Sequence, residues 1–158
     1  MKVHHYKIQT TWTGNHGQGT RDYRAYDRSH VISIEGKTDI LGSSDPSFRG
    51  DRSKHSPEDL FVSTLSTCHM LWYLHLCAVN GIVVLEYNDE ATGIMEENPN
   101  GSGRFTKVLL KPEVLVAEHD MIQKANELHL EAHKMCFIAN SINFEVVHEP
   151  IAFTAQRV

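Results

Sequence analysis

The sequence has few cysteines, and they lie far apart. Cys68, Cys77 and Cys136 are too few and too widely spaced for a disulfide framework, and no CxxC pair suggests a zinc ribbon. The first residues also lack the apolar segment of a signal peptide. We therefore expect a cytoplasmic protein. In the reducing cytosol, an isolated thiol is more often an inert core residue or a catalytic group than part of a disulfide.

Clustered positive charge is missing as well. The 20 Asp and Glu residues outnumber the 15 Lys and Arg residues, which gives a net charge of −5. The arginines between residues 21 and 28 alternate with Asp22 and Asp27, a pattern typical of a solvated, mixed face. Nucleic-acid binding relies on a basic surface that displaces counterions. We therefore expect no nucleic-acid partner.

One long hydrophobic segment, residues 56–81, is predicted to form a helix. Ser56 fits the N-cap, Pro57 fits the first helical position, and Asp59 stands at the capping-box position. Gly81 suits the left-handed residue that ends many helices. Several serines, threonines and histidines interrupt the segment, and no basic flank follows it. The pattern therefore predicts a buried helix and no membrane span.

Apolar side chains occur on every side of this predicted helix. They are Leu60, Phe61, Leu65, Met70, Leu71, Trp72, Leu74 and Leu76. A helix that is apolar all round must be covered all round. One chain of 158 residues rarely surrounds a helix of about 36 Å. We therefore predict that a second copy covers part of it in a homodimer.

The rest of the chain favours an α+β fold in one domain, residues 1–158. The predicted elements are strands at 3–12, 20–35, 82–95 and 104–117, a helix at 118–134, and a last strand or pair of strands. The segment ENPNGSG indicates a hairpin between the third and fourth strands. Pro112 predicts that the fourth strand lies at a sheet edge or carries a bulge.

The three cysteines differ in their predicted surroundings. Cys68 lies about twelve residues into the helix, too deep for the helix dipole to activate its thiol. A reactive thiolate there needs a cationic neighbour from another segment. Cys77 falls on the opposite face of the helix and is predicted to be a core residue. Cys136 follows His133 and Lys134 at the start of a short turn, where a reactive and a packed thiol are equally open alternatives.

Two histidines, His129 and His133, stand four residues apart on one face of the second predicted helix. A zincin motif needs Glu directly after the first His, whereas this chain has Glu131. We prefer an exposed amphipathic face, with a metal-ligand pair as the alternative. The remaining histidines form no spaced ligand set, so no metal site is expected. They include His4, His5, His16, His55 and His69.

Two segments taken together resemble a known family. SPEDLFVSTLSTC, followed later by AHKMCFIANS, resembles the OsmC/Ohr family of thiol-dependent peroxidases. The resemblance implies an OsmC-like fold, with antiparallel sheets and a long central hydrophobic helix in an intertwined homodimer. It implies that Cys68 attacks an organic hydroperoxide, releasing the alcohol, and that Cys136 resolves the resulting sulfenic acid. It implies no cofactor, and a dithiol such as a lipoylated protein as the reductant.

The same resemblance implies a catalytic arginine that is held by Glu58. In the OsmC branch this arginine lies in the loop before the helix, where Arg49 is our first choice and Arg52 the second. In the Ohr branch it comes from an earlier strand, which points to Arg21 or Arg24.

The chain departs from the family beside both cysteines. His69 and Met70 follow Cys68, where the family often has small residues, and Phe137 follows Cys136, where it often has proline. These departures affect substrate preference and the ease with which Cys136 resolves the sulfenic acid more than they affect the peroxide reaction itself.

The spacing of Glu58 and Cys68 predicts how the site is assembled. Ten helical residues cover about 15 Å, so an arginine held by Glu58 would need most of its reach to touch Cys68 of the same chain. In a dimer with antiparallel central helices, Glu58 of one copy approaches Cys68 of the other. We therefore predict a composite site, with Cys68 and Cys136 from one chain and Glu58, together with Arg49, from its partner.

Two other functions fit the sequence. A Cys-His hydrolase or acyl transferase would use Cys136 and His133, and it would hydrolyse an activated ester while ignoring peroxides. A non-enzymatic module that binds a small ligand or a metal would keep the fold without the peroxidase chemistry. Metal analysis of the purified protein would distinguish the second alternative.

Overall fold

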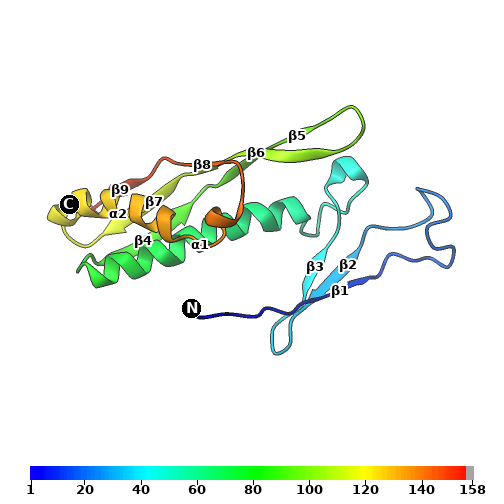
Figure 1. The fold of residues 1–158 in the computed structure, drawn as a ribbon, viewed down its shortest axis with the longest axis horizontal. Helices are drawn as coiled ribbons and strands as arrows, with labels where there is room; N and C mark the ends of the chain where they lie inside the picture. The colour runs from blue at the N-terminus through cyan, green and yellow to red at the C-terminus, as the bar shows by residue number, and fades with distance from the viewer. Residues whose placement is uncertain (156–158) are drawn as a thin grey trace. The chain divides into compact units, whose positions relative to one another are not determined.

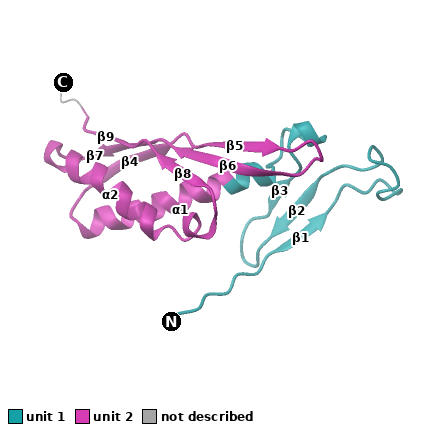
Figure 2. Ribbon diagram, turned by 45° about the horizontal axis from the view of Figure 1, so that its top comes forward, with its two compact units in different colours: residues 1–61 teal, residues 62–158 magenta. Residues whose placement is uncertain are grey.

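A computed structural model describes residues 1–155 and contains two compact units, residues 1–61 and 62–158 (Figure 2). Strands build both units, one long helix begins at the end of the first unit and continues into the second, and the second unit adds another helix of more than three turns. This mixture confirms the predicted α+β class. That the two units form one domain stays a prediction.

The first unit contains a small antiparallel sheet in the order β1-β2-β3, formed by β1 (Gln9–Trp12), β2 (His30–Ser33) and β3 (Ile40–Gly42). The strands predicted at 3–12 and 20–35 are therefore too long. Within the second range, Arg28 donates hydrogen bonds to the backbone carbonyls of Tyr23 and Tyr26, and its guanidinium lies over both rings. These local contacts favour a folded turn over an extended strand.

Helix α1 (Pro57–Val79) begins and ends where the sequence predicts. The backbone N–H of Ser56 donates to the Asp59 carboxylate at 2.9 Å, and the N–H of Asp59 donates to the Ser56 hydroxyl at 3.1 Å. This reciprocal pair is the predicted capping box. After the helix, Gly81 has a φ of +73°, a left-handed conformation that glycine adopts without steric cost.

Six strands of the second unit form two sheets in the orders β4-β7-β9 and β5-β6-β8. The strands are β4 (Val84–Asp89), β5 (Thr92–Glu97), β6 (Gly103–Leu110), β7 (Pro112–Val116), β8 (Glu145–His148) and β9 (Ile151–Phe153). The hairpin predicted from ENPNGSG joins β5 and β6. Both sheets contain the predicted antiparallel pairing, between β4 and β7 and between β5 and β6, and each adds one parallel pair, because β8 pairs with β6 and β9 with β7 in parallel.

Each of the two long strands predicted at 82–95 and 104–117 is split between both sheets. The first divides into β4 and β5, and the second divides at Lys111 into β6 and β7. Pro112 is the first residue of β7, the central strand of its sheet, and not part of an edge strand or bulge. The first position of a strand tolerates proline, because the missing N–H interrupts no hydrogen bond further along.

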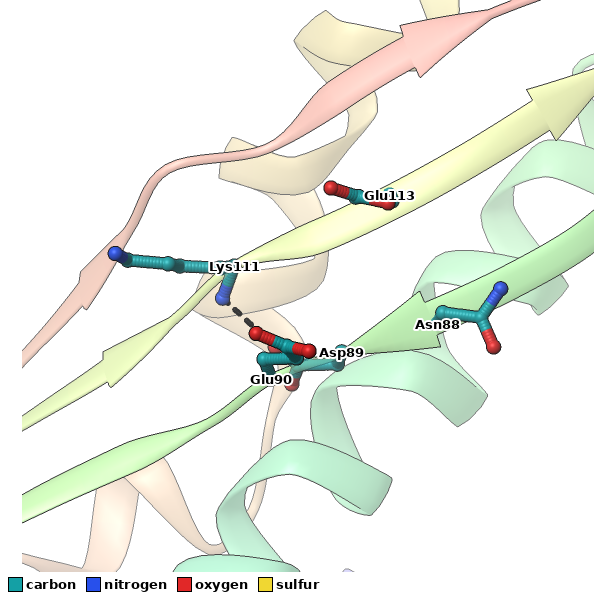
Figure 3. Close-up of a pocket in the computed structure, with 5 residues that line it drawn as sticks. All are labelled: Asn88, Asp89, Glu90, Lys111 and Glu113. Carbon is teal, nitrogen blue, oxygen red and sulfur yellow. Dashed lines mark hydrogen bonds between the residues drawn. The ribbon is translucent and has the colours of Figure 1, made fainter.

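Asp89 fixes the point where these strands separate. Its carboxylate accepts a hydrogen bond from the backbone N–H of Lys111 at 2.7 Å (Figure 3). It accepts another from the Ser66 hydroxyl of α1. It lines a pocket together with Asn88, Glu90, Lys111 and Glu113. Because Asp89 links α1 to both strand ends, we assign it a structural role.

The core of the second unit lies between α1, α2 (Ile122–Met135) and the sheet β4-β7-β9 (Figure 1). The helix predicted at 118–134 is confirmed, except that a short 3-10 turn, η2 (His119–Met121), replaces its first residues. The core combines one large aromatic ring with aliphatic and small side chains. Its buried members are Tyr73, Cys77, Ile82, Val114, Val116, Ala125, Leu128, Ala132 and Ala152.

Within one chain, α1 buries a single stripe of side chains, one from each turn. The stripe consists of Leu65, His69, Tyr73 and Cys77. Other apolar residues of the helix stay accessible, such as Leu71 at 63% and Val79 at 64% exposure. In the described part of the chain, no helix has the length and apolar character that crossing a bilayer requires.

Candidate active site

The fold brings together two cysteines that are far apart in the sequence. Cys68 lies in the middle of α1, and Cys136 is the C-cap residue of α2. The Cys68 side chain lies close enough to that of Cys136 to raise the pKa of the Cys136 thiol. Cys68 is half-buried, whereas Cys136 is only 1% exposed. One thiol of the pair is therefore open to a small molecule and the other is shielded.

The surroundings of Cys136 keep it protonated at neutral pH. Burial, followed by the interaction with the neighbouring Cys68 thiol, raises the pKa of the Cys136 thiol to about 11. The backbone N–H of Ala139, 3.4 Å from the sulfur, opposes this shift only in part. Between the two alternatives left open by the sequence, the structure favours the packed thiol. A protonated, buried Cys136 also argues against a hydrolase that uses it as the nucleophile.

The cationic neighbours that the sequence suggested for Cys136 have other partners. Lys134 forms an ion pair with Glu131 at 2.8 Å. The ring of His133 lies edge to face against that of His148, with 4.6 Å between centroids, and its backbone carbonyl accepts the N–H of Cys136 at 3.3 Å. Neither side chain therefore provides the activation that a nucleophilic Cys136 would need.

Cys77 belongs to the core, as predicted. It is 1% exposed within the core cluster, and its thiol lies beside the Tyr73 hydroxyl. Burial raises the pKa of the Cys77 thiol. Its surroundings are those of an unreactive cysteine.

Arg49 and Glu58 lie in the first compact unit. Arg49 follows the 3-10 turn η1 (Pro46–Phe48) and has a φ of 66°, the one left-handed non-glycine residue in the described chain. Its exposed guanidinium lies 5.9 Å from the centre of the Tyr23 ring. In the first turn of α1, Glu58 has a buried carboxylate oxygen, Oε2, without a hydrogen-bond partner among the described residues.

The loop that carries Arg49 is ordered by its own hydrogen bonds. The carboxylate of Asp45 accepts the N–H of Ser47 at 2.7 Å, and its carbonyl accepts the N–H groups of Phe48 and Gly50. These bonds hold Arg49 in a conformation that costs a non-glycine residue free energy, a feature that is frequent at functional sites. The other candidate arginines, Arg21, Arg24 and Arg52, are exposed.

Four histidines form a cluster that the sequence did not predict. The ring nitrogens His69 Nε2 and His129 Nδ1 are 2.9 Å apart. The ring of His148 lies 4.4 Å from that of His69 and 4.6 Å from that of His133, measured between centroids. The face containing His129 was predicted to be exposed, which is wrong, because His129 is 2% exposed. The error arose because α1 and β8, distant in sequence, supply the rings that cover it.

His69, His129 and His148 are neutral at neutral pH. Burial lowers the pKa of His69 to about 3, and the charges of the other three histidines add to this effect. Burial likewise lowers the pKa of His129 and of His148 to about 4. The rings of His69 and His129 are nearly parallel, with 10° between their planes. In residues 1–155, no three His, Cys, Asp or Glu side chains are arranged to hold a metal ion.

Aromatic rings border the thiol pair. Trp72 lies one helical turn after Cys68, on the same face of α1. It meets Phe137, the residue after Cys136, edge to face at 5.6 Å between ring centroids. The departure from the family at Phe137 therefore places an exposed aromatic ring beside the buried thiol.

Comparison with known proteins identifies the family. Residues 50–150 match the family model described as OsmC-like protein, which is more than half of the 158 residues. The chain belongs to the OsmC-like family. The matched range contains Glu58, Cys68 and Cys136, and Arg49 immediately precedes it.

Solved structures confirm the OsmC-like fold. An OsmC-like protein of unknown function from Vibrio cholerae is 34% identical, with a TM-score of 0.85 over 94% of this chain and 100% of that one. An organic hydroperoxide resistance protein from Elizabethkingia anophelis is 18% identical, with a TM-score of 0.67 over 98% and 100%. An OsmC-like protein from Mycoplasma pneumoniae is 14% identical, with a TM-score of 0.72 over 96% and 99%. No curated protein sequence matches the chain.

Proposed function

We propose that this OsmC-like protein is a thiol-dependent peroxidase that reduces organic hydroperoxides to alcohols. The observation that carries the proposal is the pairing of a half-buried thiol, Cys68, with a buried neighbouring thiol, Cys136. A peroxidatic thiol must meet the substrate, and a resolving thiol must wait within reach of it. The two cysteines meet these opposite requirements.

The chemistry proceeds in two balanced steps. The Cys68 thiolate attacks the terminal peroxide oxygen, so that an S–O bond forms, the O–O bond breaks, and the alkoxide leaves as the alcohol after taking a proton. The Cys136 sulfur then attacks the Cys68 sulfenic acid, which forms the disulfide and releases water. An external dithiol returns the pair to its reduced form by thiol-disulfide exchange. The peroxide has then accepted two electrons from that dithiol.

The apolar border of the thiol pair supports an organic substrate. Trp72 and Phe137 offer aromatic surface beside Cys68, and the exposed Leu71 adds aliphatic surface on the same helix. Burying the hydrocarbon part of an organic hydroperoxide against such groups contributes binding free energy that hydrogen peroxide cannot obtain.

We propose that Arg49 and Glu58 complete the site. A guanidinium always carries its charge and can hydrogen-bond the peroxide oxygens. The partnerless Oε2 of Glu58 is suited to accept a hydrogen bond from such a guanidinium, and the left-handed backbone of Arg49 supports a functional role for its loop. As predicted from the helix length, Arg49 and Glu58 act on Cys68 of a second copy in the proposed homodimer.

A single-turnover experiment tests the function. One equivalent of cumene hydroperoxide should consume two thiols and yield a Cys68–Cys136 disulfide, which peptide mass spectrometry would identify. Cys68→Ser should not react, and Cys136→Ser should stop at a sulfenic acid that dimedone traps. Dihydrolipoamide should then support repeated turnover. The proposal fails if cumene hydroperoxide leaves all thiols of the folded wild-type protein unchanged.

A further inference from the structure

The histidine cluster links the two elements that carry the reacting thiols. His69 directly follows Cys68 on α1, and His129 lies on α2 about two turns before Cys136. Their ring nitrogens form a hydrogen bond of 2.9 Å between two side chains that are each almost fully buried. The bond therefore joins α1 to α2 close to the active-site pair.

This hydrogen bond requires at least one neutral ring. One nitrogen donates and the other accepts, so the bond needs a lone pair on one of the two imidazoles. The far nitrogens, His69 Nδ1 and His129 Nε2, are buried without partners in the described part of the chain. In either tautomer, one buried N–H thus lacks an acceptor. Burying an N–H group without an acceptor costs free energy. That the chain buries both rings despite this cost suggests a role beyond filling space.

Apolar packing alone fixes the position of α2 less sharply than this hydrogen bond does. The apolar core that α1 and α2 share, which includes Tyr73, Leu128 and Ala132, packs without a preferred direction. A hydrogen bond is directional and weakens steeply when its atoms move out of line. Disulfide formation needs this accuracy, because the two Cα atoms must lie about 4.4–6.8 Å apart with a defined torsion.

We propose that His69 and His129 are positioning residues whose hydrogen bond holds α2 in the register that places the Cys136 sulfur against Cys68. The inference rests on the proposed function for its role in peroxide reduction. The positioning itself can be measured without a peroxide.

The test compares two substitutions of His129. His129→Asn places an amide near the position of Nδ1 and can keep the bond, whereas His129→Leu fills the space without one. The readout is the rate of Cys68–Cys136 disulfide formation with diamide, which accepts two electrons and two protons from a pair of thiols. The Leu variant should be about five- to tenfold slower than wild type, and the Asn variant should recover most of the rate. The exposed His119→Leu serves as the control and should be unchanged.

Circular dichroism at pH 7.5 would confirm that each variant is folded. If His129→Leu does not fold, His69→Gln and His69→Leu offer the same comparison from the other side of the bond, because the glutamine amide lies near Nε2. Equal diamide rates for the polar and apolar variants would overturn the proposal.

Repeating the series with cumene hydroperoxide separates this proposal from the function. A disulfide that forms with diamide in a His129-dependent way, but not with the peroxide, would refute the peroxidase and support the positioning role. Disulfide formation by both oxidants at a rate independent of His129 would refute the positioning role and support the peroxidase.

Discussion

Acidification should destabilise this protein steeply, because folding keeps several histidines neutral. The folded pKa is about 3 for His69 and about 4 for His129 and His148, whereas an unfolded histidine titrates near about 6.5. The unfolded state therefore binds more protons below about pH 6.5. The contribution to stability is complete above that pH and is lost as the pH falls toward about 4.

Within residues 1–155, the only charges that shift the pKa values of His69, His129 and His148 are those of other histidines, so no carboxylate compensates a protonated ring. His133 and His148 approach from α2 and β8, and Tyr73 of α1 stacks on His129 with 3.8 Å between ring centroids. Behind Tyr73 lies the ring of Tyr87 from β4. The charges that lower the pKa of His69 all come from the other histidines of the cluster. A proton taken up here therefore meets further positive charge as its neighbours titrate.

The magnitude follows from proton linkage. Between pH 7.5 and pH 5, one histidine that stays neutral only in the folded state lowers the free energy of unfolding by about 2 kcal/mol. The two most buried rings, His69 and His129, together account for about 4 kcal/mol. This is a large part of the roughly 5–15 kcal/mol that stabilises a small protein.

Urea unfolding followed by circular dichroism, at several pH values and one fixed protein concentration, would measure this effect. Carboxylates also contribute to acid sensitivity, so the informative quantity is the difference between wild type and His69→Gln/His129→Asn. Between pH 7.5 and pH 5, the free energy of unfolding of the double variant should fall by about 4 kcal/mol less than that of wild type. Identical pH slopes for the two proteins would refute the reasoning. The exposed His119→Gln should retain the wild-type slope.

Three further predictions concern the site. Cys77→Ser should retain peroxidase turnover but lose about 1–3 kcal/mol of stability, measured by urea unfolding, because a buried hydroxyl replaces a well-packed thiol; loss of turnover in a folded variant would contradict our assignment of Cys77 to the core. Arg49→Ala should slow the reaction with cumene hydroperoxide by orders of magnitude and Arg52→Ala much less, in stopped-flow assays; the reverse ranking would shift the catalytic role to Arg52. Refolding inactive Cys68→Ser chains together with inactive Glu58→Ala chains should restore part of the activity if the site is shared between two copies, whereas a site within one chain predicts none.

Local sequence signals predicted the features whose causes are local. Ser56, Asp59 and Gly81 determine the ends of α1 through contacts within a few residues, and the ENPNGSG segment determines the β5–β6 hairpin in the same way. The two cysteine motifs were sufficient to indicate the family, because each is a short segment with a characteristic order of residues. Helix geometry also separated Cys77 from Cys68, since nine residues of helix place them on different faces.

Only the tertiary structure decided which distant groups meet. Parallel pairing with β8 and β9 makes β6 and β7, the strands on either side of Lys111, the central strands of their sheets. Pro112 therefore lies in the middle of a sheet. The protonated state of Cys136 and the neutral state of His129 depend on burial, and other elements supply it. A spacing of four residues places His129 and His133 on one helical face, but the strength with which a ring binds a proton depends on what covers that face.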